Sequence, residues 1–187
     1  MEFNTFNISG LIEIVPRKNS DDRGYFSEIY RDDLFAAQAG PIRFVQENQS
    51  LSARTGTIRG LHFQSDPFAQ GKLVRCLAGA IFDVAVDLRH GSSTYGQWIG
   101  VELTPEQGNQ LWIPAGFGHG FCTLRPDSVV CYKVTAYYSP EYDKGLRWDD
   151  PAIGIAWPEV ADPETLSGKD RVQPILAELP SYFSNKG

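Results

Sequence analysis

The sequence is poor in the residues that build disulfide frameworks and metal sites. Its 187 residues include three cysteines, three histidines and a single methionine. Cys76, Cys122 and Cys131 are odd in number and show no C-x-x-C spacing, which predicts free thiols in a reducing compartment rather than a disulfide framework. We therefore expect a cytoplasmic protein.

Positive charge and long apolar runs are also scarce. Lys and Arg number 17 against 23 Asp and Glu, so the formal net charge is −6. A nucleic-acid partner is not expected, because binding the phosphate backbone requires an excess of cations. No apolar run approaches the ~20 residues that span a bilayer, and the first residues lack the basic and apolar regions of a signal peptide, so no membrane partner is expected.

Short strand-like segments make up most of the chain from residue 8 to residue 138. They recur at roughly ten-residue spacing with turn signals between them, which predicts an all-β antiparallel sandwich or barrel. Residues 72–87 resemble a hairpin that turns near Ala78 and Gly79. Residues 129–138 look like one strand in which Tyr132 and Tyr138 share a face.

Helical patterns are few and no compositional break marks a second domain. A short helix is expected to start at Asp32 or Asp33 and to end before Gly40, and another is expected near the C-terminus. We expect one domain over residues 1–187, with a barrel core over about 10–140 and a C-terminal extension over about 141–187.

The stretch "TGTIRGLHFQ" places Arg59 and His62 inside a predicted strand. Charged groups are costly to bury without partners, so these side chains and others on neighbouring strands are expected to face a shared polar cavity. Residues 59 and 62 of a regular strand would point to opposite faces. We therefore predict a bulge or bend at Gly60, which turns both side chains inward.

One half of a metal-binding motif common in double-stranded β-barrels is present at Pro114, Gly116 and His119. The other half is not, because Gln64 stands where a second histidine is needed and Lys72 brings a positive charge. Two imidazoles without a nearby acid make a poor transition-metal site, so no metal is expected. The chain has no G-x-G-x-x-G or P-loop pattern to hold a redox or nucleotide cofactor, and none is expected.

Ordered motifs run from about residue 10 to about residue 175, among them "DDRGYFSEIY", "QENQS", "GTIRGLHFQ", "QLWIPAGFGHGF" and "LSGKD". Together they resemble the dTDP-4-dehydrorhamnose 3,5-epimerase family. The resemblance implies a cupin-type double-stranded β-helix, or jelly roll, and a homodimer. The implied reaction is the cofactor-independent epimerisation of dTDP-4-dehydro-6-deoxy-D-glucose at C3 and C5 to dTDP-4-dehydro-L-rhamnose.

The resemblance also implies roles for single residues. His62 matches the catalytic base, Asp170 the carboxylate that pairs with it, Tyr132 the general acid and Lys72 the cation beside the C4 ketone oxygen. Asp83 is the alternative to Asp170 as the carboxylate that orients a catalytic histidine. The implied substrate-binding residues are Arg23, Phe26, Glu28, Gln46, Asn48, Arg59, His119, Tyr138 (on the thymine), Asp143 and Lys169.

These residue types suit proton transfer beside a ketone. The C–H bonds at C3 and C5 flank the C4 carbonyl, so the carbanion is an enolate whose oxygen a lysine can stabilise. A histidine has a pKa of about 6.5, near the working pH, and a tyrosine hydroxyl can donate a proton to the opposite face.

Three alternatives stay open. The first is a mono-epimerase that acts at C3 or C5 alone, with pocket residues such as Phe26 and Phe121 setting the difference. The second is a metal-dependent cupin. The third is a sugar-nucleotide-binding protein without catalysis.

Overall fold

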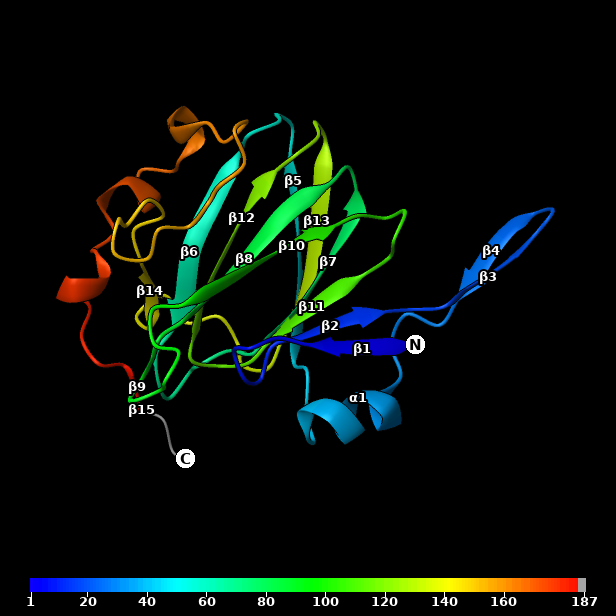
Figure 1. Cartoon of the computed structure of the whole chain (residues 1–187), viewed down its shortest axis with the longest axis horizontal. Helices are drawn as coiled ribbons and strands as arrows, with labels where there is room; N and C mark the ends of the chain where they lie inside the picture. Colours follow the sequence, from blue (N-terminus) through cyan, green and yellow to red (C-terminus); the bar gives the residue numbers. More distant parts are fainter. Residues whose placement is uncertain (185–187) are drawn as a thin grey trace.

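The computed structural model describes residues 1–184 and consists mainly of two antiparallel β-sheets (Figure 1). In spatial order, the six-stranded sheet contains β1 (Glu2–Thr5), β2 (Ile12–Val15), β11 (Gln110–Ile113), β7 (Lys72–Ala78), β13 (Ser128–Val134) and β5 (Gln46–Ser52). The five-stranded sheet contains β10 (Trp98–Leu103), β8 (Ile81–Asp87), β12 (Phe117–Thr123), β6 (Ile58–Gln64) and β14 (Asp143–Gly145). The expected all-β jelly roll is confirmed. Residues 185–187, the end of the expected C-terminal extension, lie outside the described part of the chain.

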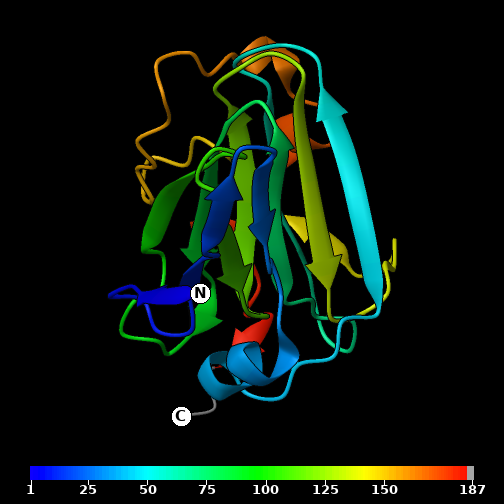
Figure 2. The same cartoon turned by 90° about the vertical axis from the view of Figure 1, so that its right-hand side faces the viewer.

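Smaller elements surround the two sheets. β3 (Lys18–Asp21) and β4 (Gly24–Ser27) form a hairpin, and β9 (Arg89–His90) pairs with β15 (Phe183–Ser184). The helices are α1 (Asp32–Ala39) and three 3-10 turns, η1 (Pro163–Thr165), η2 (Asp170–Val172) and η3 (Leu176–Glu178). Helix α1 lies at one end of the barrel and has the predicted bounds (Figure 2). None of the helices in residues 1–184 has the length and apolar character needed to cross a membrane.

Apolar side chains fill both faces of the five-stranded sheet. Ile81 and Ala85 of β8 join a core cluster that also takes side chains from the six-stranded sheet, such as Val74. The alternate residues Val84 and Val86 join a second cluster on the other face, against the C-terminal segment. Because both faces of β8 are covered, six of its seven residues are buried.

Two predictions about the strands are wrong, one about a hairpin and one about where a strand ends. β7 and β8 follow each other in the chain but belong to different sheets, so no hairpin forms at Ala78 and Gly79. The interior faces of both strands contribute to the same core cluster, so the chain crosses between the sheets and each strand pairs elsewhere. The strand expected over residues 129–138 ends at Val134.

Candidate active site

Strand β6 bends at Gly60. Arg59 pairs with Phe121 and His62 pairs with His119, so β6 advances three residues while β12 advances two. Gly60 has a φ of 115°, and a Cβ atom there would lie 2.7 Å from the carbonyl oxygen of His119. The predicted bulge is confirmed, and Arg59 and His62 line the same cavity.

Two adjoining cavities share His62, Lys72 and Tyr132 in their walls. The first cavity measures about 370 Å³ and the second about 290 Å³. The first is also lined by Gln46, Asn48, Phe63, Gln64, Gln70, Tyr138, Asp143 and Lys169. The second is also lined by Ser50, Arg59, His119, Gly120, Phe121, Ser167 and Asp170.

His62 is held by a carboxylate from the C-terminal segment. Its Nε2 lies 2.5 Å from Oδ1 of Asp170, the first residue of η2. Burial favours the neutral form of Asp170, but the contact with His62 outweighs it and holds the pKa of the carboxyl below its usual value. The ionised carboxylate therefore accepts a hydrogen bond from Nε2–H, which leaves the Nδ1 lone pair of His62 free to act as a base. Asp170, and not Asp83, is the carboxylate beside His62.

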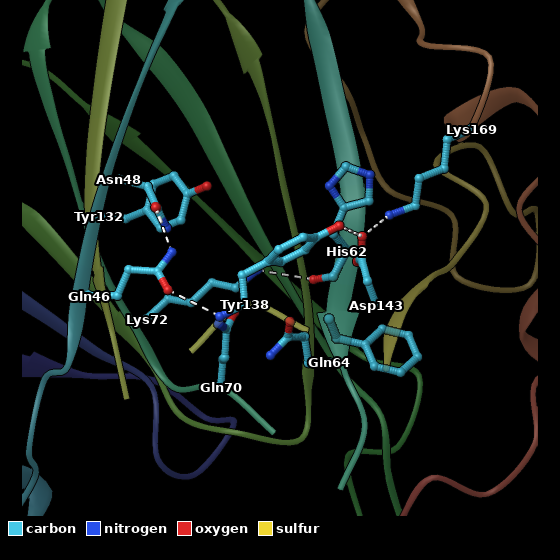
Figure 3. A pocket seen from close by; sticks show the side chains of 11 residues that line it. Gln46, Asn48, His62, Gln64, Gln70, Lys72, Tyr132, Tyr138, Asp143 and Lys169 are labelled. Atoms are coloured by element: carbon cyan, nitrogen blue, oxygen red, sulfur yellow. Dashed lines mark hydrogen bonds and ion pairs between the residues drawn. The ribbon is translucent and has the colours of Figure 1, made fainter. Parts of the chain in front are cut away.

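Lys72 and Tyr132 come from the opposite sheet. Burial lowers the pKa of Lys72 to about 8, although the negative charges of Asp83 and Asp143 favour the ammonium form. Its Nζ donates a hydrogen bond to the carbonyl oxygen of His62 at 3.2 Å. Burial raises the pKa of Tyr132, which keeps its hydroxyl protonated, whereas the positive charge of Arg59 acts in the other direction. Figure 3 shows His62 and Tyr132 on opposite sides of the first cavity.

Tyr138 crosses the first cavity in front of His62 (Figure 3). Its hydroxyl donates to Oδ2 of Asp143 at 3.1 Å, and Lys169 forms an ion pair with the same oxygen. At its other end, the backbone N–H of Tyr138 donates to Oε1 of Gln46 at 3.1 Å. Tyr138 therefore reaches the cavity from the segment after β13, and not along a strand shared with Tyr132.

Gln64, at the position that a second metal-binding histidine would take, holds this segment. Its amide nitrogen donates to the carbonyl oxygens of Phe68 and Tyr137, and its Oε1 accepts from the backbone N–H of Ser139. Its side chain thus fixes the backbone on both sides of Tyr138. Within residues 1–184, no three His, Cys, Asp or Glu side chains gather as a metal-binding group.

Three residues that the resemblance assigns to substrate binding lie apart from both cavities. Arg23 is at the tip of the β3–β4 hairpin, where its guanidinium bonds to Asp21 at 2.6 Å. Phe26 is 72% exposed on β4, and Glu28 is exposed just after it. Figure 1 shows this hairpin projecting away from the barrel.

A second histidine–carboxylate pair lies beside the first. Nε2 of His119 is 2.8 Å from Oδ1 of Asp83, and His119 is the direct cross-strand neighbour of His62. Burial lowers the pKa of His119, so its imidazole is neutral at pH 7. The sequence offered Asp83 only as an alternative partner of a catalytic histidine. It gave no signal for Ser50, Gln70 or Ser167, which also line the cavities.

The family model for dTDP-4-dehydrorhamnose 3,5-epimerase matches residues 5–178. A dTDP-4-dehydrorhamnose 3,5-epimerase of Sinorhizobium fredii is 58% identical over 183 residues, which cover 98% of this chain and 93% of the relative. A dTDP-4-dehydrorhamnose 3-epimerase of Streptomyces niveus is 39% identical and covers 97% of this chain and 90% of the relative.

A crystal structure of an epimerase has the same fold as this chain. The dTDP-6-deoxy-D-glucose-3,5-epimerase of Legionella pneumophila, in complex with dTDP-4-keto-L-rhamnose, matches with a TM-score of 0.92 and 40% identity. The match covers 100% of this chain and 99% of the other. Sequence and fold therefore agree over the whole barrel and over the C-terminal segment that carries Asp170.

Proposed function

Because the chain belongs to the dTDP-4-dehydrorhamnose 3,5-epimerase family, we propose that its two cavities bind dTDP-4-dehydro-6-deoxy-D-glucose and epimerise it at C3 and C5. The enzyme is a carbohydrate epimerase and its product is dTDP-4-dehydro-L-rhamnose. One observation carries the proposed roles: a histidine with a free Nδ1 and a protonated tyrosine face one cavity from opposite sheets.

The first step is proton removal beside the ketone. Nδ1 of His62 takes the proton from C3 or C5. The C–H electron pair forms the new C=C bond, and the π pair of the C4 carbonyl moves onto its oxygen. Asp170 stabilises the imidazolium that forms. The ammonium of Lys72 stabilises the enolate oxygen, an interaction that is usually worth a few kcal/mol of barrier.

The second step returns a proton on the other face of the same carbon. Tyr132 donates it from the opposite side of the cavity, and the enolate collapses to the ketone. The tyrosinate left behind is stabilised by the positive charge of Arg59. Exchange with solvent then restores neutral His62 and protonated Tyr132, so the enzyme is unchanged after each inversion.

The remaining polar groups suit the nucleotide and the diphosphate. Arg59 and Lys169 supply positive charge at the walls of the two cavities, and a planar guanidinium binds phosphate at two points. The ring of Tyr138 is 56% exposed at the first cavity, where it can stack on the thymine base. Gln46, Asn48 and Asp143 offer hydrogen bonds around it.

Deuterium exchange tests this function directly. The 4-keto sugar nucleotide is incubated with enzyme in deuterated water, and C3 and C5 are followed by NMR. We expect deuterium at both carbons and inversion at both. The His62→Ala variant should lose exchange at both positions while its melting temperature stays near the wild-type value. Exchange at wild-type rates in that variant would exclude His62 as the base.

The same spectra test the alternative function of a mono-epimerase. The similarity to the Streptomyces niveus 3-epimerase supports that alternative. Deuterium at C3 alone would identify a 3-epimerase. Deuterium at neither carbon, with the nucleotide sugar still bound, would indicate a binding protein and refute the enzymatic proposal.

We also infer that the enzyme works as a cytoplasmic homodimer. The β3–β4 hairpin projects from the barrel and exposes the aromatic side chains of Tyr25 and Phe26, a costly arrangement for an isolated chain. A second copy would cover them and would bring Arg23, Phe26 and Glu28 to the partner's cavity. Three free, buried cysteines are consistent with a reducing compartment.

A further inference from the structure

Asp83 is a buried carboxylate to which the steps above give no role. It lies on β8 in the middle of the five-stranded sheet and is 0% exposed. Its neighbours at two residues on either side, Ile81 and Ala85, belong to the apolar core cluster. Oδ1 accepts a hydrogen bond from His119, and Oδ2 has no hydrogen-bond partner among residues 1–184. A carboxylate in such surroundings is costly to keep ionised unless positive charge is close.

Lys72 supplies that positive charge from the facing sheet. Both side chains are buried, and of the charges that favour the ammonium form of Lys72, Asp83 acts most strongly. The other titratable groups that reach Lys72 are Asp143 of β14, which also favours the ammonium, and Lys169, which opposes it. His62 and His119 are close by on β6 and β12, and Tyr132 lies on the neighbouring strand β13.

The contact with Asp83 also decides which nitrogen of His119 carries the proton. Burial keeps the imidazole neutral, so it has one N–H, and an ionised carboxylate can only accept. The proton therefore lies on Nε2, and Nδ1 carries a lone pair. Since His119 lines the second cavity, the substrate meets a hydrogen-bond acceptor there and not a donor.

We propose that Asp83 is a positioning residue that keeps Lys72 an ammonium beside the C4 oxygen and fixes His119 as the Nε2–H tautomer. The inference rests on the proposed function, because that function places Lys72 beside the enolate oxygen. It adds that His119, which lines the second cavity, accepts a hydrogen bond from a substrate hydroxyl. Asp83 would then be a second orienting carboxylate of the site, beside Asp170, and would act through two side chains without touching the substrate.

The Asp83→Asn variant removes the charge and keeps the shape. Its Lys72 is titrated without substrate by NMR of ¹³C-labelled lysine, and its His119 by ¹⁵N-labelled histidine. We expect the Lys72 midpoint to fall by about one pH unit and the Nε2–H tautomer of His119 to become mixed. The alkaline limb of the kcat profile should move down with Lys72, so kcat should fall about fivefold at pH 8 and hardly at all at pH 6.

Asp87→Asn is the matched control. Asp87 is equally buried on the same strand but bonds to Arg89, Ser92 and Thr94 and lines neither cavity. This variant should lower the melting temperature and leave the Lys72 midpoint and the His119 tautomer unchanged. A wild-type Lys72 midpoint in Asp83→Asn, or a uniform loss of kcat at every pH, would reduce Asp83 to a structural residue and overturn the proposal.

One measurement needs no variant and no substrate. If His119 of the wild-type enzyme carries its proton on Nδ1, the proposal fails even where Asp83→Asn does not fold. Failure of the proposed function would give a different result. The Lys72 and His119 titrations would be as expected, but the wild-type enzyme would show no deuterium exchange.

Discussion

Burial controls the chemistry of Lys72 at the level of the single residue. Its pKa is lowered to about 8, so the ammonium is present below that pH and is lost above it. An uncharged amine cannot stabilise an enolate oxygen to the same extent. If Lys72 acts as proposed, the fraction of active enzyme therefore depends on pH.

We expect kcat to fall as the pH rises through about 8, measured with saturating substrate. Lys72→Arg should lack this alkaline limb, because a guanidinium stays protonated throughout, although its different shape should lower kcat at every pH. A limb in the wild type near pH 10, or an unchanged limb in Lys72→Arg, would assign it to another group.

A variant at Tyr132 should separate the rate of proton removal from the rate of inversion. In Tyr132→Phe, His62 can still take a proton and return one to the same face, but no hydroxyl supplies the opposite face. We expect the rate of inversion to fall by about 10²–10⁴ and the rate of deuterium exchange to fall much less. NMR in deuterated water gives both rates from one sample.

Tyr137→Phe provides the control for that variant. Tyr137 is 65% exposed and lines neither cavity, so both rates should stay near the wild-type values. If Tyr132→Phe lowered exchange and inversion by the same factor, Tyr132 would act in proton removal or binding and not as the acid.

At the level of the element, the bend in β6 is what brings Arg59 and His62 to the same cavity. A regular strand would send Arg59 and His62 to opposite faces of the sheet. The extra residue at Gly60 turns both side chains toward the second cavity. At Gly60 itself, the backbone of β12 lies too close to leave room for a side chain. Its conformation at φ 115° is one that only glycine adopts at low cost.

Gly60→Ala should therefore damage both stability and activity. We expect a loss of about 1–3 kcal/mol in the free energy of unfolding from the backbone conformation alone, measured by urea denaturation. The loss in kcat should exceed what the unfolded fraction explains, since His62 would be displaced from the substrate carbon.

Gly168→Ala tests whether any glycine near the site has this effect. A Cβ at Gly168 meets no atom within 4 Å and its φ is not positive, so both measurements should be close to wild type. Equal damage in the two variants would show that the bend is not the cause.

At the level of the whole molecule, the proposed dimer predicts that one active site draws on two chains. A His62→Ala chain lacks the base but keeps its hairpin, and an Arg23→Ala chain keeps the base but lacks the hairpin arginine. Each homodimer should be impaired, by different mechanisms. A heterodimer of the two would contain one site with both an intact base and an intact arginine from the other chain.

Mixing the two variants after partial unfolding and refolding should therefore restore up to about a quarter of the wild-type kcat per chain, since half of the dimers are mixed and each holds one complete site. One chain has a mass of 20.8 kDa, and light scattering should give twice that value. A monomer, or no gain on mixing, would place Arg23 outside the site.

Much of this protein is determined by its sequence. Alternation of apolar and polar residues, with turn residues between, specifies an all-β barrel, and the clash of Arg59 and His62 with that alternation specifies a bend at Gly60. Local patterns also fix the bounds of α1. All of these are properties of neighbouring residues, and chain chemistry over a few positions is sufficient to predict them.

Tertiary structure decides which distant residues meet. The crossing of the chain between β7 and β8, the arrival of Tyr138 outside a strand and the pairing of Asp83 with His119 while Asp170 pairs with His62 all depend on contacts between segments far apart in sequence. The core takes apolar side chains from both sheets, and this packing places His119 of β12 beside Asp83 of β8, while the C-terminal segment packed on the outer face brings Asp170 to His62. No local pattern carries that information.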